Sequence, residues 1–186
     1  MITASPSLST LFQTQFEASR ALPEVPLALR RDRVRRVRAL IDAHGAALAD
    51  AVQADFGVRS PQLTEVADLF VLRALTSQLD SHLPRWMKPT GVRTPLYLWP
   101  ARGRLLRQPL GVVGVISPWN YPLQLSLGPA VTAMAAGNRV MLKPSELTPT
   151  TSALTARLVH ENFAPDEFCV VQGGAEEAAE FASLPF

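Results

Sequence analysis

The sequence predicts an α/β fold, because short apolar runs alternate with helix-compatible segments over its second half. The apolar runs are Gly111–Ile116, Arg139–Lys143 and Phe168–Gln172, and each has the length of a buried strand. Strands joined through helices pair in parallel, with right-handed crossovers. Together with the upstream segments described next, these runs predict N-terminal helices, a β-hairpin arm, and an incomplete doubly wound (Rossmann-like) parallel sheet in residues 111–186.

Upstream of the sheet the pattern is helical. Residues 1–26 predict a tail and a short helix from Leu11 to Ala21. In residues 27–95, a helix from Leu27 to Asp55 is indicated by apolar residues at steps of three, four and seven: Val34, Val37, Ile41, Leu48 and Val52. Gly57 ends this helix, and Ser60-Pro61 begins a second one that runs toward Pro89.

Residues 96–110 predict a β-hairpin. Leu96–Pro100 and Arg104–Gln108 have the pattern of two short strands around a glycine-containing turn at Ala101–Gly103. Pro100 and Pro109 suit the edges of a sheet better than its centre.

Composition limits the classes of protein. Apolar residues make up 47% of the chain and charged residues 18%, which excludes an intrinsically disordered protein. A net charge of +2 gives weak support for a nucleic-acid partner. The six arginines from Arg30 to Arg38 are therefore expected to form a solvated helix face, paired with acids elsewhere in the complete fold. The single cysteine, Cys169, excludes an internal disulfide framework.

The first residues have neither the basic start nor the apolar core of a signal peptide, so a cytoplasmic setting is expected. Residues 108–138 contain no charged side chain, but four prolines interrupt them, which favours a buried core over a membrane span. The predicted sheet has three strands and no fourth, and its last strand would keep an open edge. The chain is therefore interpreted as part of a severed domain.

Candidate functional residues follow the predicted strands, because ligands of open α/β sheets bind outside the carboxyl ends of the strands. After the first strand comes Ile116-Ser117-Pro118-Trp119-Asn120-Tyr121-Pro122, in which two prolines fix the backbone on both sides of Trp119 and Asn120. A side-chain amide held in this way can stabilise an oxyanion. The alternative, which spacing alone favours, is a turn in which Asn120 bonds nearby backbone and Trp119 packs.

After the second strand, Lys143 and Glu146 lie three residues apart and could hold the hydroxyls of a ribose; equally, Lys143 could extend to water. After the third, Gly173-Gly174 could let a ligand approach the backbone or could form an ordinary turn. No glycine-rich phosphate loop occurs. Cys169 lies inside an apolar strand and is interpreted as structural, and no metal site is predicted.

The segment GVVGVISPWNYPLQLSLGPAVTAMAAGNRVMLKPSE, residues 111–146, closely resembles the NAD(P)-dependent aldehyde dehydrogenase superfamily. Its P-W-N-Y-P and K-P-S-E pieces, at this separation, are highly specific. The resemblance extends through Asp55-Phe56-Gly57, Arg85-Trp86 and the hairpin, so it covers nearly the whole chain. Within the superfamily the chain looks most like bacterial coniferyl-aldehyde dehydrogenases.

The resemblance implies a role for each candidate residue. Asn120 matches the amide that binds the thiohemiacetal oxyanion. The groups that contact the cofactor match Ile116, Ser117, Pro118 and Trp119 (the wall beside it), Lys143 and Glu146 (the adenosine ribose) and Gly173 (backbone beside the adenine). The implied cofactor is NAD, with NADP not excluded. The implied partners are an aldehyde substrate and further copies of the chain, in a dimer or tetramer joined through the hairpin, with no nucleic acid and no membrane.

The resemblance also places the glycine-rich phosphate turn, the catalytic cysteine and the glutamate base after Phe186, and Cys169 does not match the catalytic position. By itself the chain is therefore expected to be an inactive N-terminal part of an enzyme that oxidises an aldehyde through a cysteine thioester. The alternative is a non-catalytic truncated chain that binds nucleotide weakly or pairs with full-length subunits.

Overall fold

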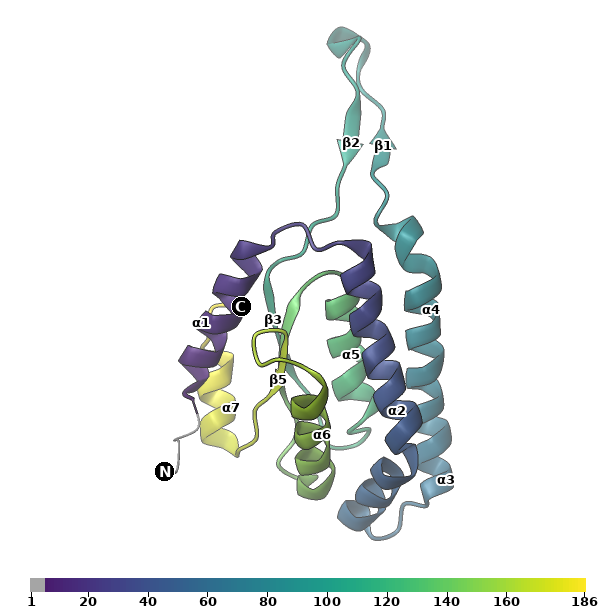
Figure 1. Cartoon of the computed structure of the whole chain (residues 1–186), viewed down its shortest axis with the longest axis vertical. Helices are drawn as coiled ribbons and strands as arrows, with labels where there is room; N and C mark the ends of the chain where they lie inside the picture. Colours follow the sequence, from purple (N-terminus) through teal and green to yellow (C-terminus); the bar gives the residue numbers. More distant parts are fainter. Residues whose placement is uncertain (1–5) are drawn as a thin grey trace.

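The computed structural model describes residues 6–186 and has helices on both faces of a parallel sheet (Figure 1). The helices are α1 (Leu8–Ala21), α2 (Leu27–Phe56), α3 (Pro61–Thr64), α4 (Phe70–Trp86), α5 (Gln124–Ala135), α6 (Pro149–Asn162) and α7 (Ala175–Ala182). A π-helical turn, Glu65–Leu69, joins α3 to α4. The strands are β1 (Thr90–Val92), β2 (Gly103–Leu105), β3 (Val112–Ile116), β4 (Arg139–Lys143) and β5 (Phe168–Val170).

The three predicted strands of the second half are confirmed, and they form one parallel sheet in the order β3-β4-β5. In its register Ile116 lies beside Lys143, and Met141 lies beside Cys169. Within residues 6–186 the outer edge of β3 is unpaired as well as that of β5, so the first strand shares the open edge that was expected only of the last.

The side chains of β4 divide the core in two, because successive residues of a strand point to opposite faces. Val140 and Leu142 pack with the apolar stripes of α2, α4, α5 and α6. Met141 packs on the other face, against Leu8 and Phe12 of α1 and Phe181 of α7. The sheet is therefore covered on both sides, as a doubly wound fold requires.

Helix α2 confirms the predicted stripe, whose five apolar residues are all buried, and it ends at Gly57 with φ of 73°. Helix α1 begins at Leu8, three residues before the predicted start, because the Ser7 hydroxyl accepts a hydrogen bond from the Thr10 N–H and Leu8 is buried. Residues 1–5 of the expected tail lie outside the described residues.

The expectation of a solvated arginine face is wrong for two of its members. Arg33 is 2% exposed and forms an ion pair with Glu167, with 2.7 Å between Nε and Oε1. Arg30 is also buried, and its Nη1 donates to the carbonyl of Ala136 at the end of α5. These side chains leave water because they satisfy groups on other elements. The pairing of Arg33 with a distant acid agrees with the expectation, but sequence spacing does not reveal which acid it is.

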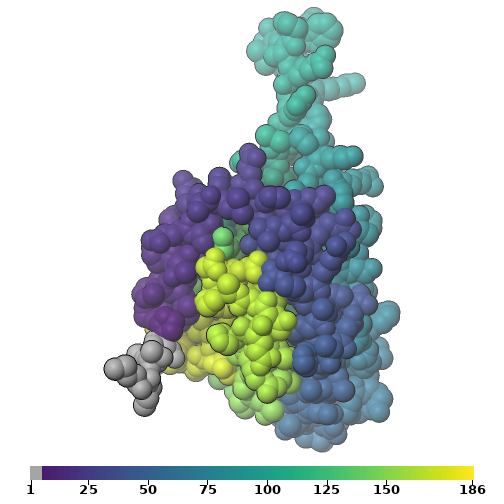
Figure 2. Space-filling view, viewed as in Figure 1, coloured from purple at the N-terminus to yellow at the C-terminus, as the bar shows by residue number. Residues whose placement is uncertain are grey.

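The predicted hairpin is present, but its first strand and its turn were wrongly placed, because Gly103 belongs to the second strand. β1 is Thr90–Val92, paired antiparallel with Gly103–Leu105, and Leu96–Leu98 forms a single 3₁₀ turn at the tip. Pro95, with φ of −57°, starts that turn, and Pro100 has no N–H to give to a ladder. The hairpin projects from the body as a narrow arm (Figures 1 and 2), with Leu96, Tyr97 and Trp99 largely exposed at its end. No helix in residues 6–186 is long and apolar enough to cross a membrane.

Candidate functional site

The three predicted groups of site residues lie at the ends of β3, β4 and β5. Parallel pairing brings them to the same end of the sheet, where the carboxyl ends of the strands meet. The backbone continues the ladder one residue past β3, where the Ser117 N–H donates to the carbonyl of Lys143 at 3.0 Å. This bond fixes the start of the Pro118–Pro122 turn against the end of β4.

The Pro118–Pro122 turn presents its polar side chain outward. Asn120 is exposed, and its amide makes no hydrogen bond to any side chain or backbone group of residues 6–186. Trp119 is half exposed and lies 6.0 Å from Phe56, ring centroid to centroid. Beneath them the Ser117 hydroxyl is buried and has no partner among the described residues. The Asn120 amide is therefore free to bind a ligand. The alternative predicted from spacing, in which this amide bonds nearby backbone, is not what the structure shows.

A buried ion pair holds this turn from behind. The Arg59 guanidinium donates from Nη1 to the backbone carbonyl of Asn120 at 2.7 Å and is hydrogen-bonded through Nη2 to Asp68. The other carboxylate oxygen of Asp68 accepts the backbone N–H of Gln124, at 2.8 Å, in the first turn of α5. Burial raises the pKa of the Asp68 carboxyl, and the Gln124 N–H and the Arg59 guanidinium act against this rise.

Sequence reasoning did not identify Arg59 or Asp68. One signal was available: Asp68 falls four residues before Leu72, on the stripe that also includes Thr76, Leu79 and Leu83, and all of these are buried. A carboxylate on an otherwise buried face needs a cationic or hydrogen-bonding partner. The identity of that partner could be found only from the tertiary structure.

Lys143 ends β4 with a side chain that is only 2% exposed, so the alternative of a lysine extending to water is wrong. Its ammonium donates to the carbonyl of Pro144 at 3.0 Å and lies 3.9 Å from the carboxylate of Glu146, which is exposed. An ammonium has three N–H donors. Since one of them is bonded to Pro144, the buried ammonium keeps capacity for a further acceptor.

A small cavity of about 150 Å³ joins the ends of β4 and β5. Its lining includes Glu146 and Ser152 on one side and Gln172 and Gly173 on the other. Gly173 has φ of 144°, and a Cβ there would lie 2.5 Å from Cγ of Glu177. The structure thus brings Glu146 and Gly173 together, with Lys143 paired to Glu146, while Asn120 belongs to the separate turn after β3.

Cys169 has the structural character expected of it. Burial raises the pKa of its thiol to about 12, and Nε2 of Gln15 lies 3.5 Å from its sulfur. Such a thiol is not ionised at neutral pH and cannot serve as a nucleophile there. Among residues 6–186, no three His, Cys, Asp or Glu side chains lie close enough together to hold a metal ion.

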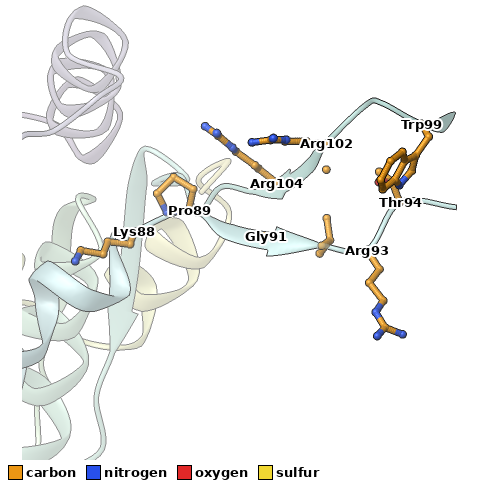
Figure 3. Close-up of a pocket in the computed structure, with 10 residues that line it drawn as sticks. Lys88, Pro89, Gly91, Arg93, Thr94, Trp99, Arg102 and Arg104 are labelled. Carbon is orange, nitrogen blue, oxygen red and sulfur yellow. The ribbon is translucent and has the colours of Figure 1, made fainter. Parts of the chain in front are cut away.

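A hollow of about 830 Å³ lies along the arm, and all the residues that line it belong to residues 88–104 (Figure 3). Its lining includes Lys88, Arg93, Arg102 and Arg104, which surround the paired strands without a carboxylate. The sequence has no acidic residue between Asp80 and Glu146. The hollow is a basic surface of the projecting arm, not an enclosed site for a substrate.

The whole chain, beyond these site residues, is similar to known proteins. Residues 9–185 match the profile of the "Aldehyde dehydrogenase family". The chain is 46% identical over 161 residues to the coniferyl aldehyde dehydrogenase of Pseudomonas sp., covering 86% of this chain and 33% of that protein. It is 39% identical to a probable coniferyl aldehyde dehydrogenase of Pseudomonas aeruginosa, covering 96% of this chain and 38% of that protein.

Among solved structures, the substrate-bound state of Staphylococcus aureus AldH superposes with a TM-score of 0.93 at 27% identity. The superposition covers 98% of this chain and 40% of that chain. The chain therefore spans between a third and two fifths of the length of these relatives.

Proposed function

Because the chain belongs to the aldehyde dehydrogenase family, we propose that it forms the N-terminal part of a cytoplasmic NAD(P)-dependent dehydrogenase. The proposed reaction is the oxidation of an aldehyde, coniferyl or another aromatic aldehyde, to its carboxylic acid through a cysteine thioester. The single observation that carries the proposal is the exposed Asn120 amide, presented at the end of β3 by a turn fixed between Pro118 and Pro122. The nucleophilic cysteine and the glutamate base would come from outside this chain.

In this proposal Asn120 acts on the aldehyde oxygen. When a thiolate attacks the aldehyde carbon, negative charge develops on that oxygen, and an amide N–H aimed at it lowers the barrier. The Asn120 amide suits this role because it carries no charge of its own and is not bonded to neighbouring groups in residues 6–186.

The residues after β4 and β5 fit the ribose of a dinucleotide, whose nicotinamide would accept the hydride that leaves the substrate. Lys143 offers a buried ammonium with unused donors, and Glu146 offers acceptor oxygens 3.9 Å away. The cavity beside them, about 150 Å³, is smaller than the roughly 300–1,000 Å³ of pockets that enclose a whole ligand, so it suits one sugar ring. Ile116, Ser117, Pro118 and Trp119 would form the wall beside the rest of the cofactor.

The test is aldehyde-dependent NADH formation by the full-length protein that carries this chain, with coniferyl aldehyde compared with an aliphatic aldehyde. We expect Asn120→Ala to lower kcat by about 10²–10³-fold, the usual effect of removing one oxyanion donor. Asn162→Ala, which removes an exposed asparagine from α6, is the matched control and should leave kcat unchanged. Absence of turnover in the unaltered protein would contradict the proposed function, and an unchanged kcat in Asn120→Ala would contradict the role of Asn120.

We also propose NAD rather than NADP as the cofactor, because the Glu146 carboxylate would accept a hydrogen bond from a free ribose hydroxyl and repel a phosphate on it. Calorimetric titration would show tighter binding of NAD⁺ than of NADP⁺. Glu146→Gln should weaken NAD⁺ binding by about tenfold, the effect of one hydrogen bond to a charged group. Equal affinities for the two nucleotides would contradict this assignment.

Self-association through the arm completes the proposal. The arm exposes Leu96, Tyr97 and Trp99 at 83%, 83% and 73%, and such apolar side chains at the end of a projecting element are typical of an interface. Its positive charge, without a carboxylate from residue 81 to 145, predicts an acidic receiving surface on the second copy.

A further inference from the structure

Arg59 lies directly behind the turn that carries Asn120. It follows α2 by three residues, and its side chain is only 7% exposed. The guanidinium carbon lies 5.3 Å from the ring centroid of Phe56, at the end of α2, and 5.1 Å from that of Tyr121, in the turn. Both aromatic rings therefore pack on the guanidinium. These contacts hold the planar guanidinium in one orientation.

The two Nη groups of Arg59 bind two groups that lie far apart in the sequence. One branch donates to the backbone carbonyl of Asn120, and the other is bonded to the fully buried carboxylate of Asp68. Asp68 in turn accepts the Gln124 N–H. The Arg59–Asp68 pair is therefore hydrogen-bonded to the backbone at two points, Asn120 in the turn and Gln124 at the start of α5.

The backbone around Asp68 is itself unusual. Asp68 belongs to the π-helical turn Glu65–Leu69, and a single turn of this kind inside α-helix is found frequently at functional sites. The carboxylate it carries is aimed at the first turn of α5, where unpaired N–H groups favour negative charge.

We propose that Arg59 and Asp68 are positioning residues for Asn120, which fix its backbone so that its side-chain amide is held where the oxyanion develops. This inference rests on the proposed role of Asn120. Neither residue needs to touch the substrate, because both act through the backbone of the turn. A shift of about 1 Å in a reacting group can change a rate by about 10²-fold. Contacts that fix only the backbone of Asn120 can therefore affect kcat.

Arg59→Lys is the sharpest test, measured in the full-length protein. Lysine keeps the positive charge that Asp68 needs, so the fold is preserved, but a single ammonium cannot reproduce the two-branched contact. We expect kcat to fall by about 10–100-fold, with the KM for aldehyde and the Kd for NAD⁺ within about twofold of the unaltered protein. Arg31→Lys, at an arginine that forms a similar two-branched pair with Asp80, should leave kcat unchanged.

A double-mutant cycle separates positioning from a general structural role. If Arg59 acts through Asn120, Arg59→Lys should lower kcat little further in the Asn120→Ala background. Losses that multiply, or a kcat that Arg59→Lys leaves unchanged, would overturn the proposal. Asp68→Asn, which keeps the shape and an acceptor oxygen for Gln124, gives a second entry to the same cycle if the lysine variant does not fold.

Hydrogen exchange gives a readout that does not depend on activity. In Arg59→Lys we expect amides in a peptide spanning residues 117–124 to exchange about tenfold faster, while a peptide spanning 139–145 is unchanged. Unchanged exchange in the turn would contradict the positioning role even if the protein turned over no aldehyde. Failure of the proposed function would instead appear as inactivity of the unaltered protein.

Discussion

The carboxylate of Asp55, in the last turn of α2, accepts hydrogen bonds from the backbone N–H and the hydroxyl of Thr151, at 2.8 and 2.7 Å. It also accepts the N–H of Thr150 at 2.9 Å. Within the described part of the chain the side chain of Thr148, the N-cap residue of α6, makes no capping bond, so Asp55 caps α6 from a different helix. The segment between β4 and α6, which follows Lys143 and contains Glu146, is thereby tied to α2.

Removing this cap should destabilise the protein. We expect Asp55→Ala to lower the free energy of unfolding by about 1 kcal/mol, the usual effect of losing an N-cap, measured by urea denaturation. Asp50→Ala, at an exposed position on the same helix, is the control and should change stability by less than about 0.5 kcal/mol. Equal effects of the two substitutions would show that the bonds to Thr150 and Thr151 contribute nothing.

The same carboxylate should make stability depend on pH. Burial tends to raise the pKa of Asp55, but the hydrogen bonds from Thr151 and Thr150 outweigh it and hold the pKa below its ordinary value. The stabilising contribution of Asp55 is then fully present above the ordinary aspartate pKa of about 3.9 and is lost as pH falls through the lower, folded-state value. Urea midpoints measured across this acidic range should converge for the unaltered protein and Asp55→Ala. A difference that persists at the lowest pH would contradict this account.

The buried pair of Arg33 and Glu167 should be costly to break from one side. Arg33→Met leaves the carboxylate of Glu167, 12% exposed, with Arg36 as its one charged partner among residues 6–186. We expect a loss of about 3 kcal/mol in the free energy of unfolding, the lower end of the range for one-sided loss of a buried pair. The double variant Arg33→Met/Glu167→Met should recover part of it, and a double variant less stable than Arg33→Met would contradict the explanation.

Cys169 should be unreactive in the folded chain. With a thiol pKa of about 12, only about one thiol in 10⁴ is ionised at pH 8. We expect a disulfide reagent to label Cys169 at least about 100-fold faster in urea than in buffer.

The isolated 186-residue chain should form no NADH from aldehydes. Turnover that Cys169→Ser abolishes would show that the structural assignment of Cys169 is wrong.

The arm should control assembly of the full-length protein. Trp99→Ser at the tip is expected to weaken self-association by about 30-fold or more, the effect of removing a central aromatic anchor, as measured by sedimentation velocity. Val58→Ser, at an even more exposed apolar residue on the body, should have no such effect. Added salt should also weaken assembly, because the arm is basic. Assembly that neither Trp99→Ser nor salt alters would exclude the arm as the interface.

Much of the architecture follows from local pattern alone. The stripe of α2, the apolar runs of β3, β4 and β5, and the glycine that ends α2 each satisfy a rule about neighbouring residues, and each was predicted to within a few positions. The arm is the exception. Its apolar residues Leu96–Leu98 have the sequence pattern of a strand, but they form a 3₁₀ turn at the exposed tip. Pro95 and Pro100, which flank this turn, restrict the backbone there.

The sequence by itself determined the family, the order of the elements and the three segments that meet at the strand ends, because these depend on contiguous residues and their spacing. Only the tertiary structure decided which side chains support them: Arg59 and Asp68 behind Asn120, Asp55 at the start of α6, and Arg33 with Glu167. These partners lie between 9 and 134 residues apart in the chain. A buried polar group must find a partner somewhere in space, and the packing of distant helices, not their sequence spacing, selects which one.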